Sequence, residues 1–375
     1  MRIKAIILSI LLFAFASGGE TVRFEHRPAL LPKPGALFQS DTLTIRMIGD
    51  VMMHTKQIEV AHIKDSIYDF SSYFSLIKDS LEQADICIAN MEFTLAGKPY
   101  TGYPAFSAPD CFIEYLASCG IDVVLCANNH IYDKGCKGLE RTIRIVKGLS
   151  DKGYGIHLCG AAADSEHIEK SSPLTLRAKG MRVSMVNFTY GTNLGADRHW
   201  PKVNYMSDKE HISDALKKST SSDLTIALPH WGEEYSLKPS DSQRSMARWL
   251  ADNGADLIIG THPHVPQTFE TTPEMNIPVV YSLGNAVSNM SAPNTQMELM
   301  ATIRLARHPN GDIELLPLQM TYLWCSRPGG FGKSYTVIPV KDFIDKKDLW
   351  TGGWDYDKML STYNKVKETI KIEDR

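Results

Sequence analysis

The sequence predicts an α/β protein, because short apolar runs alternate along it with longer segments of helical spacing. Of the 375 residues, 43% are hydrophobic and 22% are charged, which is enough apolar material for a large core. The runs that resemble strands are Leu43–Ile48, Ile86–Ala89, Val123–Ala127, Val183–Asn187, Leu224–Leu228, Leu257–Ile259 and Val279–Ser282. Between them, Leu139 and Val146 share one helix face, and so do Met246 and Leu250 before a predicted stop at Gly254.

Near the end of the chain the pattern changes to a hairpin and a final helix. Met297–Arg307 and Ile313–Met320 flank Pro309-Asn310-Gly311, and Asn-Gly between two strand-like runs is a strong hairpin signal. We expect a helix over Tyr356–Lys371 and an irregular insertion over Gly191–Asp214.

The first 18 residues have the features of a secretory signal. Arg2 and Lys4 precede an apolar run that ends at Ala16, well short of the ~20 residues that a membrane span needs. We therefore expect an exported protein that is periplasmic, extracellular or anchored through an uncleaved signal. The chain divides into this signal (1–18), a Pro-rich linker (19–41), one large domain (42–330) and a C-terminal extension with a helix (331–375).

Charge and cysteine usage exclude some classes of partner and site. The net charge is −3 and no long basic run occurs, so we expect no nucleic-acid partner. Seven cysteines permit disulfides in an exported chain, with at least one left free, but none forms a CxxC pair that would suit a thiolate zinc site. Cys87 and Cys126 lie in apolar strands and are expected to be small core residues.

Polar motifs recur at six places where an apolar strand ends. They contain the candidate residues Asp50, His54, Asn90, Glu92, Asn129, His130, Asp133, His230, Glu233, Tyr235, His262, His264 and Asn285. Ligands of open α/β sheets bind beyond the carboxyl ends of the strands, so neighbouring strands would bring these loops to one site. Carboxylates, amide oxygens and imidazoles without thiolates suit Zn, Mn or Fe, and two such ions can generate hydroxide and clamp a tetrahedral transition state.

Each motif also has an ordinary structural explanation. Asp50 could be a helix N-cap, the turn at Asn129 and His130 could be only a turn, and His230 could be a hydrogen-bonded core histidine. His262 and His264 are harder to explain in this way, because residues i and i+2 of an extended segment point to the same side. We expect this pair to bind metal. The recurrence of all six motifs at strand ends favours a shared site.

In the order of these motifs the chain resembles the CapA family, which is associated with poly-γ-glutamate capsule synthesis. The matching pieces are Gly49-Asp50-Val51-Met52-Met53-His54, Asn90-Met91-Glu92, Ala127-Asn128-Asn129-His130 with Asp133 and Gly135, His230-Trp231-Gly232-Glu233-Glu234-Tyr235, Gly260-Thr261-His262-Pro263-His264-Val265-Pro266-Gln267, and Tyr281-Ser282-Leu283-Gly284-Asn285. The family looks like a branch of the calcineurin-like metallophosphoesterases. The resemblance therefore implies a two-sheet sandwich flanked by helices (αββα) for the domain at 42–330.

The resemblance also implies a role for each position. Asp50 and His264 would bind one divalent ion, and Asn129, His230 and His262 would bind a second. His130, assisted by Asp133, would donate a proton to the leaving group or stabilise developing charge. Further metal ligands would be His54 and Glu92, and substrate contacts would come from Asn90, Glu233, Tyr235 and Asn285.

Two departures from the phosphoesterase pattern leave alternatives open. His54 stands four positions after Asp50 instead of two, and Asn90 or Glu92 stands where a bridging aspartate would fall. The alternatives are an altered dinuclear site, a mononuclear site and a weakened site. The Gly97–Pro109 loop, with Tyr103 and Phe106, is expected either to line a pocket wall or to pack as a surface loop.

The predicted function is that of an exported metal-dependent hydrolase associated with capsule or poly-γ-glutamate synthesis. Metal-activated water would attack a phosphoester or a γ-glutamyl amide. Expected partners are an anionic polymer, a small phosphoester or peptide substrate, and a membrane-bound capsule synthesis complex. The alternative is a non-catalytic, polymer-binding accessory subunit of a capsule synthesis or export complex.

Overall fold

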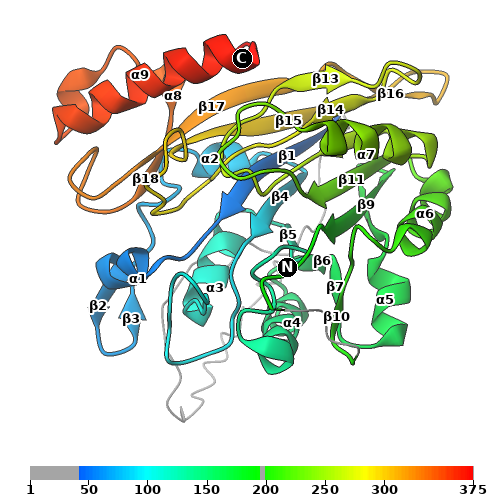
Figure 1. The fold of residues 1–375 in the computed structure, drawn as a ribbon, viewed down its shortest axis with the longest axis horizontal. Coiled ribbons are helices and arrows are strands. Elements are labelled where there is room, and N and C mark those ends of the chain that lie inside the picture. Colours follow the sequence, from blue (N-terminus) through cyan, green and yellow to red (C-terminus); the bar gives the residue numbers. More distant parts are fainter. Residues whose placement is uncertain (1–41, 195–198, 375) are drawn as a thin grey trace, which may run out of the picture.

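The computed structural model describes residues 42–194 and 199–374. Two sheets face each other and helices cover their outer faces (Figure 1). The predicted two-sheet sandwich flanked by helices is therefore confirmed. The signal predicted at 1–18 and the linker at 19–41 lie outside the described residues. Within the described ranges, no helix combines the length and the apolar run that a membrane crossing requires.

The larger sheet has the strand order β18-β17-β15-β1-β4-β5-β6, with β16 beside β15. Its parallel strands are β1 (Thr42–Val51), β4 (Ile86–Met91), β5 (Val123–Leu125) and β6 (His157–Cys159). Its antiparallel strands are β15 (Met297–Arg307), β16 (Ile313–Leu315), β17 (Gln319–Ser326) and β18 (Thr336–Pro339).

The smaller sheet has the order β13-β14-β12-β11-β9-β8. Its four central strands are parallel: β14 (Pro278–Val280), β12 (Leu257–Ile259), β11 (Leu224–His230) and β9 (Met181–Thr189). The edges β13 (Phe269–Thr271) and β8 (Leu174–Ala178) are antiparallel. Two short ribbons pair β2 (His62–Lys64) with β3 (Ile67–Tyr68), and β7 (Ala161–Ala162) with β10 (Lys202–Val203).

Helices connect the parallel strands and cover the outer faces of the sheets. The helices are α1 (Thr55–Ala61), α2 (Lys78–Glu82), α3 (Asp110–Ser118), α4 (Gly135–Asp151), α5 (Ser165–Ser171), α6 (Lys209–Lys218), α7 (Asp241–Asp252), α8 (Val340–Phe343) and α9 (Gly353–Ile370), with 3₁₀ turns η1 (Ser219–Ser221) and η2 (Lys347–Leu349). α3 and α4 pack on the larger sheet through Phe112 and Val146, and α6 and α7 pack on the smaller one through Ile212 and Leu250.

The core between the sheets follows from alternation along the strands. Ile45 and Met47 of β1 are fully buried and pack with Val183 and Met185 of β9, whereas Arg46 points to the other face. α9 packs against β15 and β17 and adds Met359 to this core. Residues after 330 thus contribute β18 to the larger sheet and α9 to the core between the sheets.

The predicted strands are all present, with ends that shift by a few residues. The hairpin is also present: β15 pairs with β16 across a turn in which Gly311 has φ +95°. The expected strand Ile313–Met320 is divided between β16 and β17. The prediction of an irregular Gly191–Asp214 was wrong in part, because β10 and the start of α6 lie within it, and the Asp208 side chain caps that helix.

The seven cysteines all lie within the described residues, and no disulfide joins any two of them. Cys87 and Cys126 are fully buried core residues, as predicted.

Replacing Met359 with alanine should lower the free energy of unfolding by about 2–5 kcal/mol, because its side chain is completely buried and would leave a cavity. The matched change Met275→Ala should alter it by less than about 0.5 kcal/mol, since Met275 is 51% exposed. Urea denaturation of both variants measures the difference. Equal effects would show that α9 adds little to the core.

Candidate metal centre

The carboxyl ends of the parallel strands of both sheets meet at one edge of the sandwich. Near the end of β4 in the larger sheet, Nδ2 of Asn90 lies 3.4 Å from Nδ1 of His230, which ends β11 in the smaller sheet. Just beyond β5, Oδ1 of Asn129 lies 2.9 Å from Nε2 of His230. The two pairs are separated by 140 and 101 residues in sequence, so the fold brings distant strand-end motifs together.

Asp50 is fully buried at the end of β1 and contacts three other predicted site residues. Its Oδ1 accepts a hydrogen bond of 2.8 Å from Nδ2 of Asn90. Its Oδ2 accepts one of 3.3 Å from the backbone N–H of His262 and lies 3.2 Å from Nδ1 of His264. Asn90 is fully buried and holds Asp50 through this bond, and its predicted substrate contact stays a prediction.

Glu92 lies at the centre of the cluster. It is fully buried, and its Oε1 accepts no hydrogen bond from any described residue. This oxygen lies 3.7 Å from Nε2 of His264, 3.9 Å from Nε2 of His230 and 4.0 Å from Nε2 of His130. These separations are too long for hydrogen bonds. A buried carboxylate oxygen with three imidazole nitrogens at this distance has the surroundings of a metal ligand.

The same three histidines have their other ring nitrogen held by an oxygen. The pairs are His264 Nδ1 with Asn285 Oδ1 at 2.9 Å, His230 Nδ1 with Thr261 Oγ1 at 2.9 Å, and His130 Nδ1 with Asp133 Oδ2 at 2.7 Å. Outer partners of this kind fix the ring orientation of metal-binding histidines. Asn285 is fully buried and orients His264, and its predicted substrate contact stays a prediction.

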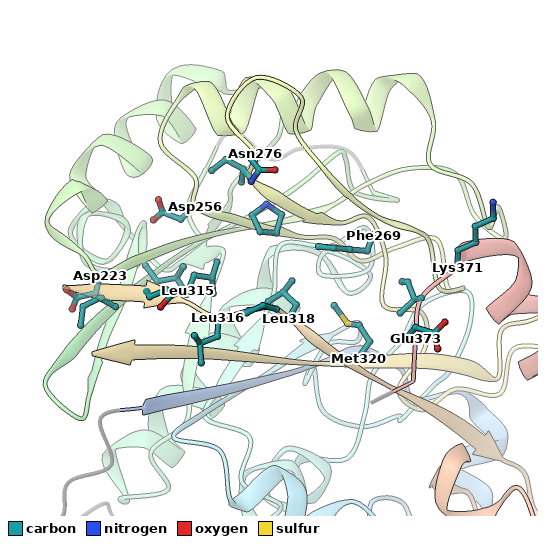
Figure 2. Close-up of a pocket in the computed structure, with 17 residues that line it drawn as sticks. Asp223, Asp256, Phe269, Asn276, Leu315, Leu316, Leu318, Met320, Lys371 and Glu373 are labelled. Atoms are coloured by element: carbon teal, nitrogen blue, oxygen red, sulfur yellow. The ribbon is translucent and has the colours of Figure 1, made fainter. Parts of the chain in front are cut away.

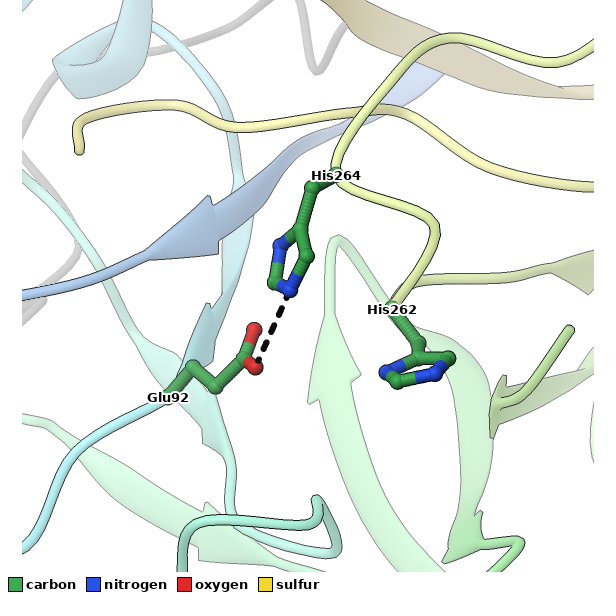
Figure 3. Close-up of side chains that lie close together, drawn as sticks. All are labelled: Glu92, His262 and His264. Atoms are coloured by element: carbon green, nitrogen blue, oxygen red, sulfur yellow. Dashed lines mark ion pairs between the residues drawn. The ribbon is translucent and has the colours of Figure 1, made fainter. Parts of the chain in front are cut away.

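The side chains of His262 and His264 project from one short turn. Glu92 lies just beyond the end of β4, and its carboxylate points toward the His264 ring (Figure 3). The segment is not extended as predicted, because His262 has φ +100° and His264 has φ +59°. Both rings are nevertheless buried in the cluster. Positive φ is costly for residues with a Cβ, and such strain concentrates at functional sites.

Two predicted site residues lie outside the cluster. His54 is the N-cap residue of α1, and its Nδ1 lies 3.1 Å from Oε1 of Gln57 and 3.2 Å from the backbone N of Asn289. The structure therefore does not group it with the other candidate metal ligands. Glu233 is exposed and lines a separate cavity of about 240 Å³ beside Tyr190.

Tyr235 and Phe106 lie around the cluster. Tyr235 is 41% exposed, and its ring centroid lies 6.3 Å from that of His264. Phe106 is fully buried, with its ring edge-on to His130 at 4.7 Å and to His54 at 5.2 Å. Of the two expectations for the Gly97–Pro109 loop, Phe106 thus forms part of the wall beside His130, whereas Tyr103 is 73% exposed.

Sequence reasoning missed Tyr190 and Asn193. The Tyr190 ring packs 4.6 Å from His262 and lies nearly parallel to His230 at 6.4 Å. Nδ2 of Asn193 lies 3.2 Å from Nδ1 of His130. Both residues follow β9, another parallel strand, whose carboxyl end carries no imidazole or carboxylate. Their position after a predicted parallel strand was the available signal.

Burial and neighbouring charges give the histidines different proton affinities. Burial, together with the nearby imidazoles of His264 and His130, lowers the pKa of His262 to about 3. Burial also lowers the pKa of His230 well below its usual value and that of His54 to about 4. Burial opposes the charged form of His264 too, but the carboxylates of Glu92 and Asp50 outweigh it and raise its pKa to about 9.

The residues present fit a divalent metal ion. Glu92, His262 and His264 form one group of potential ligand atoms within 4.8 Å of one another, and Asp50, Glu92 and His230 form a second. Two atoms that bind one ion at about 2.1 Å each lie no more than about 4.2 Å apart, which the Glu92–imidazole distances satisfy. Nδ1 of His262, also buried, has no partner among the described residues. Glu92 belongs to both groups.

A cavity of about 780 Å³ lies at the opposite ends of the strands (Figure 2). Its lining includes Leu224, Pro278 and Ile313, the first residues of β11, β14 and β16. No histidine lines it, and both groups of potential metal ligands lie at the carboxyl edge of the sheets.

Two helix-flanked sheets and a buried cluster of histidines and carboxylates define an α/β sandwich protein with a site compatible with metal ions. Sequence comparison then gives the family. Residues 44–290 match the family described as "Bacterial capsule synthesis protein PGA_cap", and the chain belongs to it.

Among its relatives, "Capsule biosynthesis protein CapA" of Bacillus anthracis is 28% identical over 296 residues, which cover 75% of this chain and 68% of that protein. "PGA biosynthesis protein CapA" of Bacillus subtilis (strain 168) is 26% identical over 327 residues, or 84% of this chain and 79% of that protein. A phosphatase from Mycoplasma pneumoniae is similar in structure, with a TM-score of 0.45, 13% identity, and coverage of 76% of this chain and 94% of that one.

Metal binding should release a proton from His264 at pH 7. Only a neutral imidazole binds metal. At pH 7, His264 is charged because its pKa is about 9, whereas His262 is already neutral because its pKa is about 3. Affinity for Mn²⁺ should therefore rise as the pH increases from 6 to 8. Calorimetry in buffers of different ionisation enthalpy measures the released proton. His264→Gln should abolish this release, whereas the control His308→Gln, at a surface histidine paired with Glu314, should retain it; equal release from both variants would contradict the assignment.

Proposed function

We propose that this protein is an exported, metal-dependent hydrolase that acts in the synthesis of a capsule or poly-γ-glutamate polymer. The observation that carries the proposal is the buried Oε1 of Glu92, which lies among three imidazoles and accepts no hydrogen bond from the described residues. Membership of the capsule synthesis family supports the biological setting. The resemblance of the motifs to metallophosphoesterases supports hydrolysis as the reaction class.

The ligands of the metal ions would be Asp50, Glu92, Asn129, His230, His262 and His264. Divalent ions bound there would act as Lewis acids and lower the pKa of water. Glu92 belongs to both groups of potential ligand atoms, so its carboxylate would contribute to the metal site where the sequence lacks the expected aspartate.

His130 is the residue suited to assist the leaving group. Oδ2 of Asp133 binds Nδ1 of His130 at 2.7 Å and also accepts a hydrogen bond of 2.8 Å from the backbone N–H of Phe106. Asp133 therefore fixes the ring and leaves Nε2 directed toward the cluster. From there Nε2 can donate a proton to a departing oxygen or nitrogen. The substrate class consistent with this arrangement is a phosphoester or a γ-glutamyl amide.

A second function has one specific observation in its favour. His54 belongs to neither group of potential ligand atoms, whereas the sequence predicts it as a ligand of the first metal site. A non-catalytic subunit that binds polymer or metal within a capsule synthesis complex would not need this ligand.

Metal content tests the proposal directly. Protein purified without chelator should contain a divalent transition metal by elemental analysis, and His262→Ala should lose most of it. The metal-loaded protein should hydrolyse 4-nitrophenyl phosphate or γ-glutamyl-4-nitroanilide, and chelation should stop the reaction. Activity without metal would contradict the proposal, and bound metal without hydrolysis would favour the accessory function.

The change His130→Ala should lower kcat by on the order of 10²–10⁴-fold while the bound metal stays constant, because this ring assists the leaving group. The control His308→Ala should change neither quantity, since His308 pairs with Glu314 on the surface. Steady-state kinetics and elemental analysis on the same preparations separate the two effects. A His130→Ala variant with full activity would remove this residue from the chemistry.

A further inference from the structure

The strand that carries Asp50 contains a bulge just before it. Ile48 pairs with Ala89 and Asp50 with Asn90, so Gly49 is the extra residue in the β1–β4 ladder. A bulge leaves the inserted residue without its ladder partner. The backbone N–H of Gly49 instead donates a hydrogen bond of 2.6 Å to Oε1 of Glu298 on β15. Glu298 is 1% exposed, so this contact is shielded from water.

The backbone around Glu298 also holds the loop that orients His264. Gly284 forms an antiparallel bridge with Glu298, and the backbone N–H of Asp50 donates to the Gly284 carbonyl oxygen at 2.9 Å. A Cβ on Gly49 would lie 2.0 Å from that oxygen, so β1 and the loop are in direct contact. The next residue of the loop is Asn285, whose Oδ1 contacts His264.

Packing alone does not explain a glutamate at position 298. The neighbours Met297 and Leu299 on β15 are apolar core residues, and burial of a carboxyl group is costly without compensation. Only one carboxyl oxygen of Glu298 has a partner, because Oε2 contacts no donor among the described residues. Among the described residues, the Glu298 carboxyl group therefore accepts one hydrogen bond, from the backbone N–H of Gly49.

We propose that Glu298 is a positioning residue of the metal centre. Its carboxyl group accepts the free N–H of the bulge, fixes the backbone at Gly49 and thereby holds Asp50 against Asn90 and His264. The proposal rests on the proposed metal binding, because it assigns Glu298 to the ion that Asp50 would hold.

Cobalt binding to the metal-free protein, followed by isothermal titration, tests this role without any need for activity. Glu298→Ala should raise the Kd of at least one Co²⁺ binding step by on the order of 10–100-fold, the usual effect of removing a group that orients a ligand. Glu298→Gln keeps an acceptor for Gly49 and should stay within about threefold of the wild type. The matched control is Leu299→Ala, an adjacent buried residue of the core between the sheets.

The thermal midpoint of each metal-free variant separates positioning from general destabilisation. Glu298→Ala and Leu299→Ala should both lower the midpoint, but only Glu298→Ala should weaken Co²⁺ binding. Equal weakening by Leu299→Ala, a Glu298→Gln variant as weak as Glu298→Ala, or an unchanged Kd in Glu298→Ala would each overturn the proposal. A wild-type protein that binds no Co²⁺ would instead overturn the proposed metal binding itself.

Discussion

The burial of the Glu92 carboxylate between two sheets is the constraint on which the arrangement of the site depends. A fully buried carboxylate is costly unless cations or hydrogen-bond donors surround it. Its Oε1 faces imidazoles from the β5 end of the larger sheet and the β11 and β12 ends of the smaller one. The carboxyl edges of both sheets must therefore lie together. A slip of either sheet would leave Glu92 buried without these neighbours.

Outside the central cluster, the fold fixes each donor through a neighbouring oxygen or N–H group. Thr261, Asn285 and Asp133 hold the Nδ1 atoms of His230, His264 and His130, and leave their Nε2 atoms directed inward. The backbone has positive φ at both His262 and His264. This conformation is strained, and the surrounding contacts stabilise it. Rigidity of this kind suits a site that must hold ions and a reacting group in one geometry.

The chemistry of the site and the membership of the family support the same proposed function. The donor set of imidazole, carboxylate and amide oxygen suits transition metals and hydrolysis. Membership of the capsule synthesis family gives the proposed hydrolysis its biological setting. The exposed Tyr235 and half-exposed Tyr190 offer aromatic surface beside the proposed metal site.

The sequence by itself determined the alternation of strands and helices and the candidate residues at the strand ends, because both depend on local periodicity and on residues next to each other in the chain. It also identified the Asn310-Gly311 hairpin. Only the tertiary structure decided which candidates meet. It paired His54 with Gln57 and Asn289, brought Asn90 and Asn285 into contact with Asp50 and His264, and added Tyr190 and Thr261. These outcomes depend on the packing of two sheets and on turns with positive φ, which no local pattern encodes.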